Sequence, residues 1–316
     1  MTADQIRQLF RSIRRAPGKE VRYAPHKPLL LLLALARVQQ GLPRQFSYES
    51  IEPDLKQLLT EFGPSSAPNT RHLPFWHLHS DHQGQLWDLQ LPPDLQQHPR
   101  SVAPSLTSMR HEEVLGGFSA EVEQYLREHP ALLIEIAREL LQETFPETLH
   151  DDIAQAVGLD LTTPVQTARE DDSNAANYSR RPRRSREFRE RVLRAYEYRC
   201  CICGFDLRIG HLPAGLEAAH IQWHTAGGPD IEANGLSLCA LHHKLFDLGA
   251  FSLDPASMKI VFSEHAMSGS RGMTGELRHH GQDLLRPLVS EASPGPAFLR
   301  WNWAHVFKKN ARRLPS

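Results

Sequence analysis

Apolar residues in the first half of the chain recur mostly with the spacing of α-helices. Residues 3–14 place four apolar side chains on one face, which predicts an amphipathic helix. A run of leucines surrounds the next segment on all sides and predicts a central buried helix. Around Asp81 and Gly84, aromatic residues and leucines instead predict two short strands joined by a turn. The predicted elements are helices at 3–14, 28–38 and 51–62, two strands within 73–89, and two helices separated near Pro130 that end about Phe145.

A polar stretch separates this region from the rest of the chain. Residues 151–185 are poor in aromatics and rich in Asp, Ser, Asn and Arg, apart from one short helix predicted at Asp151–Val157. A new helix is expected after Ser185, a residue type that caps helix N-termini. Further on, we expect a strand that ends at His220 and a helix over 237–247. The predicted organisation is α+β, with a mixed helical domain at 1–165, a linker at 166–185 and a second domain at 186–316.

Charge is balanced over the whole chain but uneven along it. The 316 residues carry a formal net charge of −1, with 40% hydrophobic and 23% charged residues, which is typical of a globular protein large enough for two cores. Between Arg180 and Arg194 there are eight arginines and two acidic residues. Such a local basic patch attracts a phosphate backbone, although a merely solvated basic stretch has the same composition.

The sequence predicts neither secretion nor a membrane partner. Its first residues are charged and amphipathic, unlike a signal peptide. The apolar run Pro28–Ala36 is much shorter than the roughly 20 residues that span a bilayer. All four cysteines lie between Cys200 and Cys239. This clustering favours a metal site in a reducing cytoplasm over a disulfide scaffold.

Two pairs of metal-ligating residues stand 36 residues apart. Cys200 and Cys203 form a C-x-x-C pair, and Cys239 and His242 form a C-x-x-H pair. Three thiolates and one imidazole make a closed tetrahedral zinc site, so we predict a structural Zn²⁺. Cys201 has no partner in this scheme, and it either packs in the core or exchanges with Cys200 as the ligand.

The segment between and just beyond these pairs carries a second constellation. A strand histidine (His220), a loop asparagine (Asn234) and a helix histidine (His243) follow one another in an order and spacing that resemble the HNH nucleases. The resemblance implies a ββα-metal fold. It also implies that His220 is the general base that takes a proton from water, and that Asn234 orients the strand bearing it.

The same resemblance implies a catalytic divalent cation, Mg²⁺ or Mn²⁺, held by His243. Asp247 lies four residues later, on the same helical face, and is the expected second ligand. Many HNH enzymes carry a ligand directly before the general base, but this chain has Ala219 there. Either fewer protein ligands hold the cation, or Glu217 or Asp247 compensates, or activity is weak.

Two N-terminal segments resemble a further family. Ala24–Leu33 and Leu73–Leu78 are similar to the sulfur-binding domain of phosphorothioate-dependent, McrA-like type IV restriction enzymes, where it precedes an HNH domain. The resemblance implies an apolar cavity for a sulfur atom, which is less strongly hydrated than the phosphate oxygen it replaces. This chain departs from the family with Leu73 in place of a tyrosine and Lys27 in place of an arginine. The predicted DNA-binding residues are His26, Lys27, Arg71, Leu73, Pro74 and His77, with a Gly116-Gly117 loop nearby.

The predicted function is a cytoplasmic, metal-dependent DNA endonuclease. Residues 1–165 would read phosphorothioated double-stranded DNA, and residues 186–316 would cut it with a one-metal HNH site. Two alternatives stay open: the N-terminal domain reads methylated cytosine, by flipping it, or the chain binds DNA without cutting it, as Ala219 would allow. A homodimer would suit the reaction, since cutting both strands needs two active sites or two visits.

Overall fold

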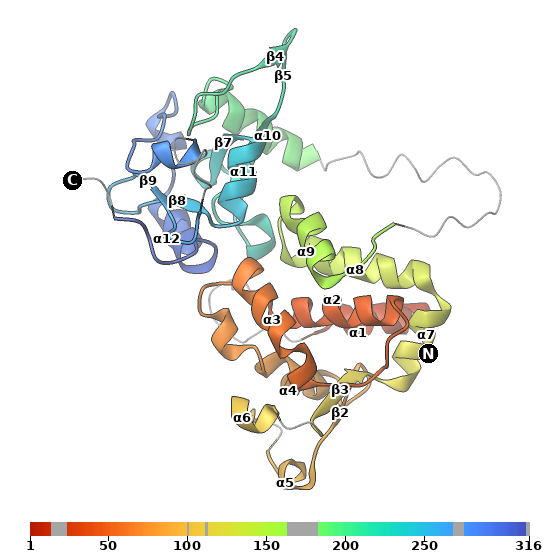
Figure 1. The fold of residues 1–316 in the computed structure, drawn as a ribbon. Helices are drawn as coiled ribbons and strands as arrows, with labels where there is room; N and C mark the ends of the chain where they lie inside the picture. The colour runs from red at the N-terminus through yellow and green to blue at the C-terminus, as the bar shows by residue number, and fades with distance from the viewer. Residues whose placement is uncertain (14–23, 100, 111–112, 163–182, 268–274, 314–316) are drawn as a thin grey trace, which may run out of the picture. The chain divides into compact units, whose positions relative to one another are not determined.

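The computed structural model describes residues 1–13, 24–99, 101–110, 113–162, 183–267 and 275–313 (Figure 1). They belong to two compact units, Met1–Val165 and Gln166–Ser316. Most of the predicted linker at 166–185 lies outside the described residues.

The N-terminal unit is built around helix α2 (His26–Gln39). Its leucines are buried on every side, so the helix must be covered on every side. Helix α1 (Ala3–Arg11) packs against α8, one of the covering helices. The helices in contact with α2 are α3 (Tyr48–Phe62), α4 (Leu73–Asp81), α7 (Ala120–Glu128), α8 (Pro130–Thr144) and α9 (His150–Val157).

A small antiparallel sheet completes this unit, together with the short helices α5 (Pro93–Gln96) and α6 (Leu106–Met109). Its strands β1 (Phe46–Ser47), β3 (Leu115–Phe118) and β2 (Trp87–Gln90) lie in the order β1-β3-β2. Gly116 and Gly117 therefore sit in the central strand, so the loop predicted at these residues is wrong. A Cβ atom on Gly116 would lie 2.7 Å from the Phe75 ring, so the strand needs glycine for close packing.

The predicted strand over the first part of 73–89 is also wrong, because Leu73–Asp81 is helix α4. Pro74 stands in the first helical turn, where its missing N–H is not needed. Phe75, Trp76 and Leu78 are all fully buried, a spacing that a strand with one core face cannot produce. The second predicted strand is confirmed as β2, which pairs with β3 and not with the 73–81 segment.

The C-terminal unit has a two-stranded hairpin packed between two helices. Strands β6 (Leu216–His220) and β7 (Gly235–Cys239) pair antiparallel, with helix α10 (Arg183–Ala195) and helix α11 (Ala240–Asp247) both in contact with them. This is the predicted ββα arrangement. The remaining elements are β4 (Arg208–Ile209), β5 (Leu212–Pro213), β8 (Phe251–Leu253), β9 (Ile260–Phe262) and α12 (Pro296–His305).

Two predicted helix starts in this unit are wrong. Ser185 lies inside α10, which begins at Arg183, so it is not the residue that precedes the helix. The helix expected from Ser237 begins three residues later, at Ala240. Ser237 instead pairs with Ala218 in the hairpin, because tertiary pairing with β6 extends the strand up to Cys239.

Candidate functional site

A glycine brings helix α10 onto the end of the hairpin. His220, the last residue of β6, pairs with Gly235 of β7. A Cβ atom on Gly235 would lie 2.4 Å from a methyl group of Val192 and 3.1 Å from the Phe188 ring. Without a side chain there, Phe188 reaches His220 and stacks on it, with ring centroids 4.1 Å apart and planes 13° from parallel.

The imidazole of His220 has a carboxylate partner. Its Nε2 lies 2.8 Å from Oδ1 of Asp230, and the two side chains are 22% and 26% exposed. Burial lowers the pKa of His220, and the Asp230 carboxylate opposes this effect. The base is therefore neutral near pH 7 and keeps access to solvent.

Asn234 closes the loop between the two strands. The side chain is completely buried. Its Oδ1 accepts a hydrogen bond from the backbone N–H of Gln222 at 2.8 Å, and its Nδ2 donates to the carbonyl oxygens of Gln222 and Pro229, both at 3.0 Å. A buried amide satisfied on both sides joins the end of β6 to the far side of the loop.

His243 lies between two carboxylates. Its Nδ1 is 2.5 Å from Oε2 of Glu217, and its Nε2 is 3.2 Å from Oδ2 of Asp247. Burial disfavours the charged ring, but Asp247 and Glu217 outweigh burial and raise the pKa of His243 to about 10. The other oxygen of Asp247 accepts a hydrogen bond from the Trp223 indole at 3.2 Å.

The pair His243–Asp247 fits a divalent cation. Ligand atoms bound side by side at about 2.1 Å from a small cation are about 3 Å apart, which matches the separation of Nε2 and Oδ2. Glu217 then holds Nδ1–H and leaves Nε2 for the cation. Ala219, at the position of the missing family ligand, is completely buried in the apolar core.

The four predicted zinc residues come together in a second cluster. Their ligand atoms all lie within 4.8 Å of one another, with His242 Nδ1 3.5 Å from Cys200 Sγ and 3.2 Å from Cys239 Sγ. Three sulfurs and one ring nitrogen at these separations suit tetrahedral Zn²⁺. Hydrogen bonding with Cys200 lowers the pKa of Cys239 to about 3, so a thiolate is favoured there.

Two further residues define this cluster. Cys201 is fully buried in the core and is not one of the four, so the cluster contains Cys200 rather than its neighbour. Glu276 places Oε2 2.7 Å from Nε2 of His242. The two atoms are close without the geometry of a hydrogen bond, while Nδ1 of the same ring faces the sulfurs of Cys200 and Cys239.

In the N-terminal unit, two of the predicted cationic residues are already paired. The Lys27 ammonium lies 2.6 and 2.8 Å from the carboxylate oxygens of Asp81, whose side chain is 4% exposed. Arg71 is buried and contacts Glu52 at 2.5 Å. Arg110 also contacts Glu52, at 2.6 Å, but its side chain remains 48% exposed. Lys27 and Arg71 each form an ion pair within this unit, and their predicted contact with DNA stays a prediction.

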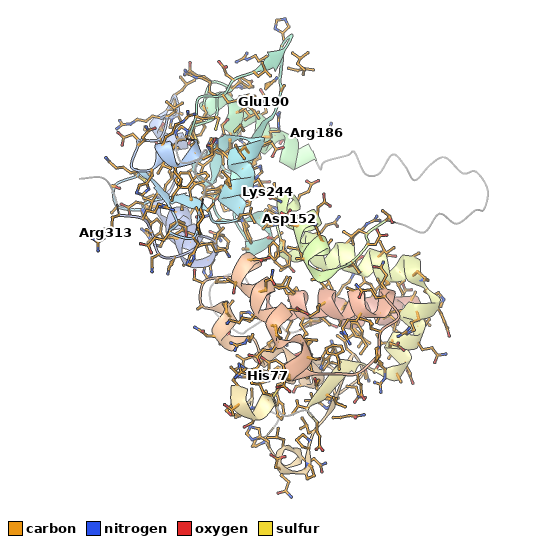
Figure 2. All side chains as sticks on the ribbon, in the orientation of Figure 1. His77, Asp152, Arg186, Glu190, Lys244 and Arg313 are labelled. Atoms are coloured by element: carbon orange, nitrogen blue, oxygen red, sulfur yellow. The ribbon has the colours of Figure 1, made fainter. Side chains whose placement is uncertain are left out.

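The other predicted residues cluster around the first turn of α4. Pro74 is buried and Leu73 half-buried. His77, on the same helix (Figure 2), is half-buried, and burial lowers its pKa. His26 lies at the start of α2, with Nε2 2.9 Å from the Thr70 hydroxyl, and burial lowers its pKa as well. The lowered pKa values of His26 and His77 favour the neutral form of both rings.

The family model of the ScoMcrA-like DNA sulfur-binding domain matches residues 3–162, half of the chain. The chain belongs to this family. The HNH endonuclease model matches residues 200–254, which contain both metal-ligating pairs, His220 and His243. Both resemblances predicted from the sequence are confirmed.

Solved structures of sulfur-binding domains are similar at low identity. That of ScoMcrA complexed with phosphorothioated DNA is 22% identical, with a TM-score of 0.42, over 48% of this chain and 94% of that chain. That of SprMcrA complexed with phosphorothioated DNA is 17% identical, with a TM-score of 0.43, over 50% and 95%. The type IV phosphorothioation-dependent restriction endonuclease ScoMcrA is 22% identical, with a TM-score of 0.39, over 55% of this chain but only 34% of its own. No curated protein matches the chain.

The sulfur-binding domain and the HNH domain both contain functional contacts that the sequence did not reveal. Asp230 and Glu276 were not predicted, because no fixed spacing links them to the histidines they contact. The Glu52 ion pairs were missed for the same reason.

Within the described ranges, no helix is long and apolar enough to cross a membrane.

Proposed function

We propose that this protein is a modification-dependent DNA endonuclease that binds phosphorothioated duplexes through residues 1–165 and cuts them with residues 186–316. The observation that carries the proposal is the presence, in one chain, of a sulfur-binding domain and of an HNH domain in which His220 and the His243–Asp247 pair are in place.

The chemistry follows from the positions of these side chains. His220 accepts a proton from a water molecule, which attacks the phosphorus. His243 and Asp247 would hold Mg²⁺ or Mn²⁺, which supplies charge relief on the phosphate and on the departing oxygen. Asn234 keeps the loop after His220 closed, and the zinc cluster ties α11 to the turn after α10.

Recognition in the N-terminal domain is proposed to depend on weak hydration rather than on charge. A sulfur atom enters an apolar surface at lower cost than a phosphate oxygen, because it gives up less hydration. The half-buried side chains of Leu73 and neutral His77 offer such a surface, while Lys27 and Arg71 are held in internal ion pairs. Thiolate ligands need a reducing compartment, so we propose that the chain acts in the cytoplasm.

Matched duplexes test both halves of the proposal. The full chain is incubated with unmodified, single-phosphorothioate and 5-methylcytosine duplexes, and binding and Mn²⁺- or Mg²⁺-dependent cleavage are measured. We expect tight binding and cleavage of the phosphorothioate duplex only, and loss of cleavage in His220→Ala with binding kept. Equal affinity for all three would refute sulfur recognition. Cleavage that is the same in wild type and His220→Ala would refute the assigned base. Whether the chain is a homodimer is tested by sedimentation of the chain bound to DNA, which should show two chains per duplex.

A further inference from the structure

The loop from Ile221 to Asn234 is held rigidly on both sides of Asp230. Before it, the carbonyl of Pro229 accepts a hydrogen bond from buried Asn234. At Asp230 itself, the backbone carbonyl accepts from Arg191 Nη2 at 2.6 Å, and the same guanidinium pairs with Glu232 at 2.9 Å. The carboxylate therefore reaches His220 from a fixed backbone.

The Asp230 contact determines which ring nitrogen of neutral His220 carries the proton. An ionised carboxylate only accepts hydrogen bonds, so Nε2 at 2.8 Å must be the donor. Nδ1 is then the unprotonated nitrogen, the form that a general base needs. The ring cannot easily turn over to exchange the two atoms, because one of its faces is stacked on Phe188.

The loop itself is shaped for this contact. A Cβ atom on Gly228 would lie 1.8 Å from the carbonyl oxygen of Gln222 and 2.8 Å from Nδ2 of Asn234. Only a glycine allows the chain to pass so close to the end of β6, two residues before Asp230. The contact of His220 with Asp230 therefore depends on local backbone geometry and not on flexible side chains.

We propose that Asp230 is the positioning residue of the general base: it fixes His220 as the Nε2–H tautomer, directs Nδ1 to the attacking water, and stabilises the imidazolium after proton transfer. The proposal rests on the proposed nuclease function. In the step itself, an O–H bond of water breaks, its proton goes to Nδ1, and the water oxygen forms the new bond to phosphorus. The bond from phosphorus to the departing oxygen breaks, and that oxygen leaves with the electron pair and takes a proton from solvent.

Cleavage by Asp230→Asn tests this role, with Asp283→Asn, at an exposed aspartate of the same unit, as the matched control. We expect Asp230→Asn to slow single-turnover cleavage about tenfold or more, but less than the ~10²–10⁴-fold loss expected when a general base is removed. The Kd for DNA should not change. Asp283→Asn, which lies outside the loop that carries Asp230, should cleave like wild type.

The pH profile separates positioning from a loss of structure. The charged or titratable groups near His220 are Asp230, Asp247 and His224. Since the Asp230 charge favours protonated His220, its removal should lower the pKa of the base and move the acidic limb of the rate profile to lower pH. A slower variant whose acidic limb stays in place would mean that Asp230 only supports the loop, and a variant with unchanged rate and profile would overturn the proposal.

A measurement without activity keeps the inference separate from the proposed function. Long-range ¹H–¹⁵N spectra of the full chain, with His220→Gln used for assignment, report the tautomer directly. We expect Nε2–H in wild type and a mixture of tautomers in Asp230→Ala. An Nδ1–H tautomer in wild type would refute the positioning role. A wild type that shows the Nε2–H tautomer but cuts no duplex would refute only the nuclease function.

Discussion

The Nε2 atom of His243 lies 3.2 Å from Oδ2 of Asp247, one turn further along α11. Both atoms belong to the same short helix, so their separation is set by helix geometry and does not require a distant segment to move. This pair would provide two adjacent ligands for a cation without any contribution from the position before His220, where Ala219 is buried.

Asp247→Asn should weaken the cation site strongly. Loss of a residue that only supports a metal ligand costs about 10–100-fold in affinity or activity, so loss of a ligand should cost at least as much. We expect cleavage to fall about 100-fold at low Mn²⁺ and to recover partly at high Mn²⁺. The exposed Glu264→Gln is the control. A variant with the same rate and the same Mn²⁺ dependence as wild type would exclude Asp247 as a ligand.

The zinc cluster should depend on Cys239 but not on Cys201. Cys239→Ser removes one of the four clustered ligands, whereas Cys201→Ala changes a buried residue outside the cluster. We expect mass spectrometry of metal content to find zinc in wild type and in Cys201→Ala, and little in Cys239→Ser, which should also melt at lower temperature. Full zinc content in Cys239→Ser would contradict the assigned site.

Gly117→Ala should destabilise the sulfur-binding domain. The new Cβ would lie 2.0 Å from the backbone carbonyl oxygen of Arg44, so the backbone must shift. Overpacking of this kind costs about 1–3 kcal/mol, which urea unfolding followed by tryptophan fluorescence can measure. If the glycine pair instead contacted DNA, the substitution would weaken binding and leave the unfolding midpoint in place.

Glu52 should stabilise the same domain in a pH-dependent way. Its hydrogen bonds with Arg110, then with Arg71, lower its pKa to about 2, from 4.5 in the unfolded chain. The ionised form is favoured by folding, so the stabilisation is complete above about pH 4.5 and is lost as the pH falls toward 2. The difference in pKa corresponds to about 3 kcal/mol at pH 7.

Urea unfolding of Glu52→Gln at several pH values measures this contribution. The variant should be less stable than wild type at pH 7, and the two should converge as the solution is acidified, because the wild-type carboxylate is then protonated. Glu49→Gln, an exposed residue of the same helix, should show neither effect. A gap between Glu52→Gln and wild type that stays constant down to pH 3 would contradict the ion-pair account.

Several elements were predictable because they depend on local spacing. The 3.6-residue period of α1 and the i, i+4 pair His243–Asp247 follow from the sequence alone. The C-x-x-C and C-x-x-H pairs were also predictable from the sequence, because two ligands three residues apart can bind one ion. An ambiguous local pattern gave a wrong prediction at Leu73–Asp81. The aromatic stretch there is compatible with a strand or with a fully buried helix, and packing against α2 favours the helix.

The sequence by itself determined that this chain has a helical N-terminal domain, an HNH motif and two pairs of metal-ligating residues. The tertiary structure decided which side chains form hydrogen bonds and ion pairs with the predicted site residues. Asp230 contacts His220 from the loop that follows β6, and Glu217 of β6 contacts His243 of α11. Asp81 forms an ion pair with Lys27, which lies 54 residues earlier in the chain. Spacing within one helix or knuckle is fixed by backbone geometry, whereas contacts between elements form only when the whole core is packed.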